Sequence, residues 1–301
     1  MKLTDIQILK LGKTIHHIRN SNFFYGQRFT TDRITSYEEF CTLPLLSFEI
    51  LAQGYPFAYS CADTKSLISG RIQTEGKEPV MNLYTEIDLA HNAEMTGRAF
   101  SIAGIKDDDT ILLISPTETC AAFASACEKF RQFLIPASGL THEKLFNLIN
   151  DSDTTCLLGD TADLVKFVET CRTDGMELTG TALRTGVFCG KALTEGTRKH
   201  IEKETGMEVY HTSSFGDFFN GLASDCRIHD GMHVWDDHYI AEIINPATGA
   251  PVPDGEDGEL AVTSLSAVAL PLIRFRTGKT AHIVSREKCE CGLHTPKISY
   301  I

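Results

Sequence analysis

The chain has 301 residues, of which 42% are hydrophobic and 23% charged, and this composition excludes a largely disordered protein. The length fits one large α/β domain or two smaller ones. The formal net charge of −12 argues against nucleic acid and anionic membranes as partners, because binding to either needs a basic surface.

The amino-terminal residues 1–69 are predicted to be a helical segment. The stretch 8–18, ILKLGKTIHHI, places apolar residues at helical spacing, and Thr35 or Ser36 can cap a second, short helix. This end of the chain is too polar for a signal peptide, and no apolar run approaches the roughly 18 residues that cross a membrane. We therefore expect a cytoplasmic protein.

From about residue 70, predicted strands and helices alternate. Apolar stretches predict strands at 110–115, 134–138, 156–160 and 182–190, and the segments between and around them predict helices at 88–105, 121–133, 142–150, 162–171 and 193–206. Repeated β-α units imply a parallel sheet with right-handed crossovers. Residues 70–225 are therefore predicted to form an α/β core.

The pattern changes in the last part of the chain, residues 226–301. HYIAEIIN and GELAVTSL predict strands, and PATGAPVPDGEDG between them is rich in the Pro, Gly and Asp residues of turns. These features predict an antiparallel β subdomain. The expected fold class is thus α/β, with a helical amino-terminal segment, a parallel βα core and a β subdomain at the carboxyl end.

Several stretches resemble one known family, in the same order along the chain. The longest is HVWDDHYIAEIINPATGAPVPDGEDGELAVTSLSAVALPLIRFRTG, and FFYGQRF, YEEFCTLPLLSFEILAQGYPF, NLYTEIDL and FCGKALTEGTRKHIE support it. Over nearly its whole length the chain resembles the phenylacetate–CoA ligase and coenzyme F390 synthetase branch of the adenylate-forming enzymes. The resemblance implies the large domain of a ligase that uses ATP and Mg²⁺ to join a carboxylic acid to AMP. The acyl group then passes to coenzyme A or another acceptor.

The family's phosphate loop is a Ser-, Thr- and Gly-rich run that ends in Gly-Lys-Pro. The corresponding segment, RIQTEGKEPVMNLYT (71–85), is shorter and has lost that run. Glu75 and Glu78 stand where groups that attract a triphosphate are needed. We therefore favour a polar turn in which Gly76 and Lys77 are remnants of a nucleotide-binding loop.

The family's adenine and magnesium motif, Tyr-Gly-Leu-Thr/Ser-Glu, corresponds to SSFGD at 213–217. By the resemblance, Ser213 replaces the aromatic residue that stacks on adenine, and Gly216 replaces the hydroxyl that contacts the α-phosphate. Ser214 is a second remnant of the nucleotide site. Asp217 keeps the acid and is either a remnant magnesium ligand or a helix cap. No other catalytic residue is assigned.

Two more family motifs differ at their acidic residue. The Tyr-Arg-Thr-x-Asp pattern, whose Asp binds the ribose, reads RFRTGK here, so Arg276 is a remnant while Lys279 takes the place of the acid. An ammonium group cannot accept hydrogen bonds from ribose hydroxyls. In the Gly-Ala-Glu motif, Gly190 remains and Lys191 stands in place of the acid.

The printed sequence stops at ISYI, before the family's small lid domain with its catalytic lysine, so we expect that lid to be absent. The first hypothesis is a catalytically impaired binding or partner module that still accepts an aryl or acyl carboxylic acid. The alternative is an active acid–CoA ligase or acyl-transfer enzyme that is completed by a separate lid-domain or carrier protein. Binding of ATP, Mg²⁺ and CoA, and a homodimer, are expectations from the family alone.

Four residues at the two ends of the β subdomain match family members that carry the same Cys, His and Cys-x-Cys pattern. Cys226 and His233 precede the subdomain, and Cys289 and Cys291 follow it. Three thiolates and an imidazole suit tetrahedral zinc in a structural site. The alternative is a set of buried cysteines with a surface histidine, and His229 and His294 are further candidate ligands.

Three smaller patterns have plain structural explanations. The run 236–238, Asp-Asp-His, is interpreted as a solvated loop, with acid–base chemistry as the alternative. Ser115 and Glu118 predict a capping box before an apolar helix. Ser213 near His211 resembles a nucleophile and base, but no Gly-x-Ser-x-Gly elbow supports this hypothesis.

Overall fold

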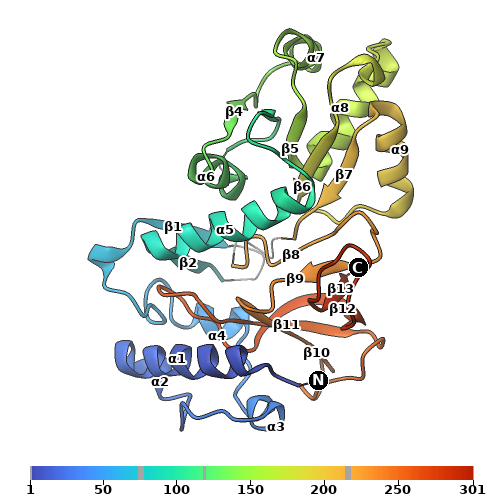
Figure 1. Cartoon of the computed structure of the whole chain (residues 1–301). Coiled ribbons are helices and arrows are strands. Elements are labelled where there is room, and N and C mark those ends of the chain that lie inside the picture. The colour runs from blue at the N-terminus through green and yellow to red at the C-terminus, as the bar shows by residue number, and fades with distance from the viewer. Residues whose placement is uncertain (1, 74–77, 118–119, 214–217, 301) are drawn as a thin grey trace. The chain divides into compact units, whose positions relative to one another are not determined.

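The chain is divided into two compact units in this computed structural model, which describes residues 2–73, 78–117, 120–213 and 218–300. Unit 1 comprises Met1–His91, Phe215–Phe219 and His233–Ile301, and unit 2 comprises Asn92–Ser214 and Asn220–Met232 (Figure 1). Unit 2 is thus inserted between two parts of unit 1 along the chain. The division into 1–69, 70–225 and 226–301 follows secondary-structure content and stays a prediction.

Unit 2 contains the predicted parallel sheet, with strand order β4-β3-β5-β6-β7. The strands are β3 (Thr110–Leu113), β4 (Phe133–Pro136), β5 (Cys156–Asp160), β6 (Thr185–Cys189) and β7 (Glu208–His211). The helices are most of α5 (Glu86–Ile102), then α6 (Ala121–Lys129), α7 (His142–Asp151), α8 (Thr161–Asp174), the short η2 (Leu178–Gly180) and α9 (Glu195–Thr205). A short strand, β8 (Ala223–Ser224), is bridged to the end of β7 through Thr212 and Ser224.

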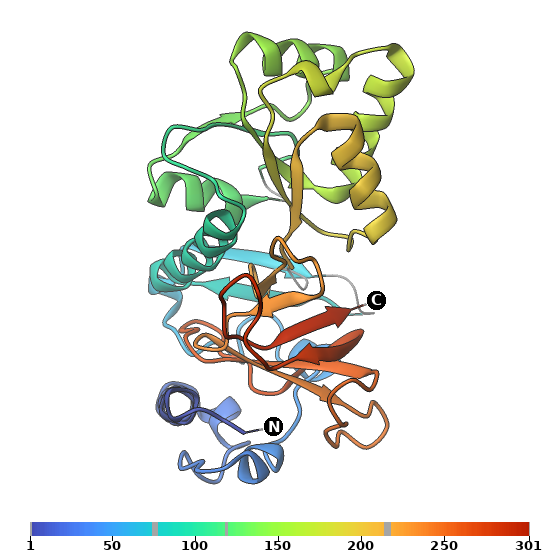
Figure 2. The same cartoon turned by 45° about the vertical axis from the view of Figure 1, so that its right-hand side comes forward.

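Helices cover both faces of this sheet, because successive residues of a strand point to opposite sides. Leu112, Leu157 and Phe188 belong to one buried cluster with apolar residues of α7, α8 and α9. Ile111 and Leu158 belong to a second cluster with residues of α5 and α6. Figures 1 and 2 show α8 and α9 beside the strands of this unit. Burial on both faces explains why β3 and β5 are apolar runs in the sequence.

Unit 1 combines helices from the start of the chain with sheets. The helices are α1 (Asp5–Ser21), α2 (Phe23–Gly26), α3 (Tyr37–Cys41), α4 (Phe48–Ala52) and η1 (Thr64–Ser66). The strands β1 (Ser69–Gln73) and β2 (Val80–Tyr84) form a two-stranded antiparallel sheet. The strands β10 (Tyr239–Ile244), β11 (Gly258–Ser264), β12 (Phe275–Ser285) and β13 (Lys297–Tyr300) form an antiparallel sheet that continues to β9 (Met232–Val234).

The two ends of the chain pack against each other inside unit 1. Leu46 forms a parallel bridge with Phe275, at the start of β12. The hydroxyl of Tyr25 donates to the backbone oxygen of Pro271 at 2.9 Å, and the backbone N–H of Cys61 donates to Ala269 at 2.8 Å. The helical segment and the β subdomain therefore share one core.

The predicted fold class is confirmed, and one local prediction is wrong. Ser36 caps α3 as expected, by accepting a hydrogen bond from the backbone N–H of Glu39. Ser115 does not cap α6, because that helix begins at Ala121 and the Ser115 hydroxyl instead donates to Asp163. Glu118, the other half of the predicted capping box, lies outside the described residues.

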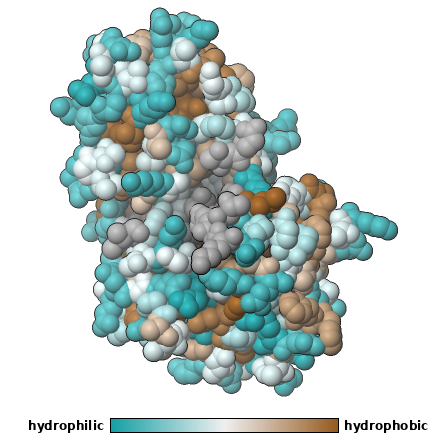
Figure 3. Space-filling model, turned by 180° about the vertical axis from the view of Figure 1, so that it is seen from behind, coloured by the Kyte–Doolittle hydropathy of each residue, from teal (hydrophilic) through white to brown (hydrophobic). Residues whose placement is uncertain are grey.

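Within the described ranges, no helix is both long enough and apolar enough to span a lipid bilayer. Hydrophilic residues cover much of the face shown in Figure 3, and apolar residues lie on it in scattered groups. This distribution agrees with the acidic, mixed composition of the chain.

Candidate functional site

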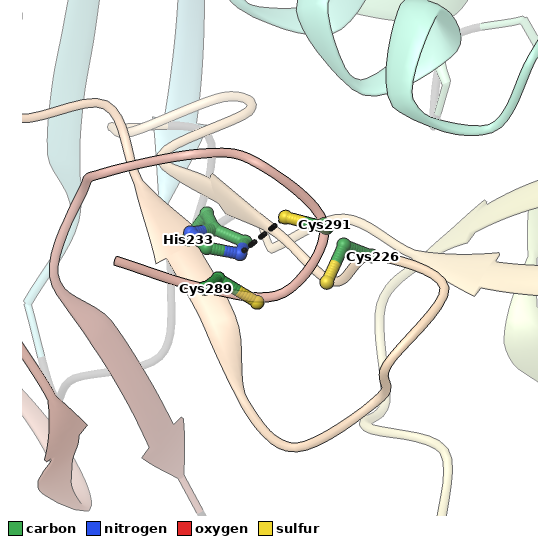
Figure 4. Close-up of side chains that lie close together, drawn as sticks. All are labelled: Cys226, His233, Cys289 and Cys291. Atoms are coloured by element: carbon green, nitrogen blue, oxygen red, sulfur yellow. Dashed lines mark hydrogen bonds between the residues drawn. The ribbon is translucent and has the colours of Figure 1, made fainter. Parts of the chain in front are cut away.

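Three cysteines and one histidine form a cluster whose geometry could hold a metal ion. The ligand atoms of Cys226, His233, Cys289 and Cys291 all lie within 4.8 Å of one another. Figure 4 shows these side chains directed toward a common centre. His233, on β9, is fully buried, and its Nε2 lies 3.4 Å from the Sγ of Cys291. The resemblance to family members with the same Cys, His and Cys-x-Cys residues had suggested these four as ligands of one site.

The chain around the cluster orients its ligands. The Nδ1 of His233 lies 2.9 Å from the hydroxyl of Thr295, and an N–H at Nδ1 that donates to this hydroxyl leaves Nε2 free of a proton on the side of the sulfur atoms. Gly292 has a φ of +102°, and its backbone N–H donates to the carbonyl of Cys289 at 2.9 Å. This tight turn places Cys289 and Cys291 on the same side of the loop.

The donor chemistry fits a structural metal centre. Thiolate and imidazole donors are those of tetrahedral zinc sites, in which ligand atoms lie about 2.0–2.3 Å from the ion and therefore roughly 3.5–3.8 Å from each other. The Cys291–His233 distance of 3.4 Å is close to that separation. His229, a further candidate ligand, instead bonds through Nδ1 to Asp225 at 3.0 Å. His294 is likewise not a member of the cluster.

Several residues that the resemblance assigns to a nucleotide-binding site lie outside the described residues. These are Gly76 and Lys77 of the shortened phosphate loop, and Ser214 and Asp217 of the adenine and magnesium motif. Their assignments stay predictions.

Ser213 and Gly190 follow the carboxyl ends of β7 and β6 in the parallel sheet. Ser213 is fully buried, and its hydroxyl accepts from the backbone N–H of Ala223 at 3.1 Å. Its own N–H donates to the Ala223 carbonyl at 2.8 Å. Gly190 has a φ of +85°, and a Cβ there would lie 2.0 Å from the Oδ2 of Asp160, so this position needs glycine. Ser213 is therefore engaged with the backbone and is not positioned as a nucleophile.

Arg276 is held by an ion pair within the β subdomain. Its Nε donates to the Oε2 of Glu259 at 2.9 Å, and its guanidinium also donates to the backbone oxygen of Pro246 at 2.9 Å. The other carboxylate oxygen of Glu259 accepts from the N–H of Gly278 at 3.1 Å. Glu259 therefore fixes the Arg-Thr-Gly turn, after which Lys279 is exposed to solvent.

One buried group near the sheet edge was not recognised from the sequence. The carboxylate of Asp225 accepts from the N–H of His211 at 2.9 Å and lies 3.0 Å from the Nδ1 of His229. Burial raises the pKa of Asp225, an effect that His229 opposes. Burial lowers the pKa of His211 to about 4, so its imidazole is neutral at pH 7. Asp225 and His211 are 14 positions apart, and no sequence pattern predicted their hydrogen bond.

The run 236–238 was interpreted as a solvated loop, but in the structure Asp236 and Asp237 are only partly exposed. The backbone oxygens of Asp236 and Asp237 accept from the side chains of Gln7 and Lys10. His238 is buried, and its ring packs edge-on against His91 at 5.5 Å between ring centres. These contacts connect α1 to the loop before β10.

Comparison with known proteins identifies the fold. Among solved structures, the chain superposes on an open conformation of 2-hydroxyisobutyryl-CoA ligase with a TM-score of 0.88, at 18% identity, over 97% of this chain and 67% of that one. Apo MatB from Rhodopseudomonas palustris gives a TM-score of 0.60 at 15% identity, over 79% of this chain and 48% of that one. The fold is therefore that of the large domain of adenylate-forming enzymes.

Curated relatives narrow the resemblance to one branch. The chain is 28% identical over 289 residues to phenylacetate-coenzyme A ligase of Escherichia coli K12, which covers 92% of this chain and 66% of that protein. It is 27% identical over 287 residues to the Pseudomonas putida protein of the same name, with 91% and 65% covered. No model of a protein family matches the chain. The chain is a relative of the phenylacetate–CoA ligases, as its sequence predicted, and it spans slightly less than two thirds of their length.

Proposed function

We propose that this chain is a phenylacetate–CoA ligase-like protein that keeps a site for an aryl or acyl carboxylic acid but is impaired in adenylation. It acts as a binding or partner module. The single observation that carries this proposal is the turn after Arg276. The position that the family fills with a ribose-binding Asp is an exposed lysine here, Lys279.

The contacts of that turn support the loss of ribose binding. Glu259 hydrogen-bonds to the turn, but Arg276 and the N–H of Gly278 already occupy both of its oxygens. Lys279 carries hydrogen-bond donors only, so it cannot accept from the two ribose hydroxyls. A nucleotide placed there as in the family therefore loses both of these contacts, each worth about 1 kcal/mol.

The adenine position gives independent support. Ser213 stands where the family has an aromatic residue, and it is fully buried with its hydroxyl bonded to Ala223. A buried hydroxymethyl group offers no ring face for a base to stack on, and such stacking is worth about 1–3 kcal/mol. Weak binding of ATP is the expected result.

A second function has support from the fold. The chain keeps the large-domain fold of a CoA ligase with a TM-score of 0.88. A separate lid-domain or carrier protein that docks on this scaffold would complete an active acid–CoA ligase or acyl-transfer enzyme. In this alternative, Mg²⁺, ATP and CoA are substrates or cofactors of the completed enzyme.

One titration separates the two functions. Purified protein is titrated with Mg-ATP and a panel of aryl and fatty acids while melting temperature and pyrophosphate release are followed. We expect stabilisation by an acid alone, and neither an ATP-dependent shift nor pyrophosphate. Pyrophosphate release by the isolated chain would exclude the impaired module, and release only after addition of a separate lid-domain protein would support the second function.

A variant with the opposite charge at position 279 tests whether Lys279 accounts for weak binding of ATP. Lys279→Asp restores an acceptor at the ribose position, and we expect ATP to bind at least several-fold more tightly than to the unmodified chain. Lys65→Asp makes the same charge change at an exposed site on η1 and serves as the control. Equal affinity in all three proteins would show that position 279 does not contact the nucleotide.

We further propose that the Cys226, His233, Cys289 and Cys291 cluster holds a structural zinc ion. The support is the donor set and the Thr295 hydroxyl that orients His233. All four protein donors face one centre, so no position remains for a substrate. Metal analysis of untagged protein is expected to give one zinc per chain. Less than about half an equivalent, together with freely titratable thiols, would contradict a zinc site of this kind.

A further inference from the structure

Two cysteines that lie far apart in the sequence meet inside unit 2. The Sγ atoms of Cys120 and Cys189 are 3.8 Å apart, although 69 positions separate the residues. Cys120 is the residue directly before α6, and Cys189 is the last residue of β6. They are distinct from the cysteines of the candidate metal centre.

This contact has the geometry of a precursor to a disulfide. At 3.8 Å the two sulfur atoms are already in van der Waals contact, and they need to approach by about 1.8 Å to reach the S–S bond length of about 2.05 Å. Rotations about the Cα–Cβ bonds give movements of this size.

The pair lies in a buried region of unit 2 whose backbone is held by packing and hydrogen bonds. Both residues belong to the buried cluster that α5 and α6 form on one face of the parallel sheet. The backbone oxygen of Cys189 accepts from the hydroxyl of Thr161 at 2.9 Å, which fixes the end of β6. Cys120 is 3% exposed and Cys189 9% exposed, so a small oxidant reaches Cys189 more readily.

Other cysteines of this unit lie in deeper surroundings. Burial raises the pKa of Cys127 and of Cys156 to about 12, and that of Cys171 to about 11. The thiolate is the reactive form of cysteine, so these three thiols react slowly at neutral pH. Oxidation at these three positions should therefore be slow under mild treatment with peroxide.

We infer that Cys120 and Cys189 form a reversible disulfide when the protein meets a hydroperoxide. The thiolate of Cys189 attacks one peroxide oxygen, the O–O bond breaks, and the products are a sulfenic acid and, from hydrogen peroxide, water after protonation. The sulfur of Cys120 then attacks the sulfur of Cys189, the S–O bond breaks, and a second water leaves with the thiol proton. The two sulfur atoms together lose two electrons, which reduce one peroxide.

The bond changes the edge of the sheet at which β6 ends. It joins the start of α6 to the residue before Gly190, so it tethers the loop that carries Gly190 and Lys191. Ligands of open α/β sheets bind beside the carboxyl ends of the strands. Oxidation therefore stiffens a segment at that edge, and a dithiol reductant releases it.

Peptide mapping tests the inference directly. Trypsin releases Cys120 and Cys127 together in peptide 107–129, and Cys189 in peptide 185–191. After treatment of the folded, untagged protein with a small molar excess of hydrogen peroxide and alkylation of the remaining thiols, we expect the two peptides to be linked. The linked species should be lighter than their sum by two hydrogens and should disappear after reduction with dithiothreitol.

Single variants assign the bond. The link should persist in Cys127→Ala, which removes the other thiol of peptide 107–129, and should be lost in Cys120→Ala and in Cys189→Ala. Mapping of the unmodified protein keeps the test valid if a variant does not fold. Separate sulfinic or sulfonic acids without a linked peptide, or a link that survives in Cys120→Ala, would overturn the inference.

Discussion

Removal of the buried arginine Arg274 should destabilise unit 1 strongly. Its side chain and that of Glu242 are 3% and 0% exposed, and the Nε and Nη2 of Arg274 donate to the two carboxylate oxygens at 3.1 and 3.0 Å. A further N–H donates to the carbonyl of Leu43 at 2.9 Å. Arg274 also has a φ of +49°, an unusual conformation for a residue with a side chain, which these bonds maintain.

The substitution Arg274→Met keeps most of the side-chain volume but leaves the Glu242 carboxyl without its cation. Removal of one partner of a buried, hydrogen-bonded ion pair costs about 3–5 kcal/mol. For a unit of this size, that loss lowers the melting temperature by roughly 6–20 °C. The double variant Arg274→Met with Glu242→Leu removes the orphaned charge and should recover much of the loss.

The loss should depend on pH. Burial raises the pKa of Glu242, and Arg274 opposes that rise, so Arg274→Met raises this pKa further. A carboxyl with a raised folded-state pKa contributes stability that is fully present below its unfolded pKa of about 4.5 and is lost as pH rises through the folded-state pKa. The free energy of unfolding of Arg274→Met should therefore fall relative to the unmodified protein by up to about 1.4 kcal/mol per pH unit between the folded-state pKa of Glu242 in the unmodified protein and its higher value in the variant.

Urea unfolding followed by tryptophan fluorescence reports on the stability of unit 1, which contains Arg274. Trp235 is the only tryptophan of the chain, it is buried, and it belongs to unit 1. Arg286→Met is the matched control, because Arg286 and its partner Asp254 are 25% and 50% exposed and their pair is worth less than about 1 kcal/mol. A loss below 1 kcal/mol in Arg274→Met, or one that is the same at pH 5 and pH 8, would refute this reasoning.

Three more outcomes follow from single positions. Because burial lowers the pKa of His211 to about 4, the stability it contributes is present above its unfolded pKa of about 6.5 and is lost as pH falls toward 4, by about 3 kcal/mol in all. His211→Gln should reduce this fall in the free energy of unfolding, as measured by urea unfolding followed by circular dichroism. An unchanged dependence on pH would contradict the role of His211. Gly190→Ala should cost about 1–3 kcal/mol more than Gly139→Ala, because both have positive φ but only the first places a Cβ against Asp160. Thr295→Val should weaken zinc binding about 10–100-fold in a chelator competition while Thr295→Ser preserves it, and equal affinities would show that the hydroxyl does not orient His233.

The central strands of the parallel sheet, β3, β5 and β6, were predictable because they are buried on both faces. The stretch CLLGD at 156–160 coincides with β5, because its first four residues are buried without polar alternation. The cap at Ser36 was predictable for a similar reason, because its acceptor bond spans only three residues. The four metal-cluster residues were predicted because they match the Cys, His and Cys-x-Cys positions of the family that the chain resembles, and because their donors suit zinc.

Contacts over long sequence separations were not predictable in this way. Arg274 and Glu242 are 32 positions apart, and neither residue type signals a buried pair by itself. Cys120 and Cys189 meet only because the Cys189 side chain lies on the face of the sheet that α6 covers. The capping-box prediction at Ser115 was wrong because a distant acid, Asp163, takes its hydroxyl.

The insertion of unit 2 within unit 1 determines the order in which the chain can fold during synthesis. The first 91 residues contact a sheet whose strands are made last, such as the bridge between Leu46 and Phe275. Unit 2 is nearly continuous and has its complete sheet once β7 has left the ribosome, so it can fold first. More than a hundred further residues must be synthesised before the carboxyl-terminal strands of unit 1 can cover the apolar faces of α1 to α4. In that interval those apolar faces are exposed on the nascent chain, and truncation within β12 should release a protein in which unit 2 is folded and unit 1 is not.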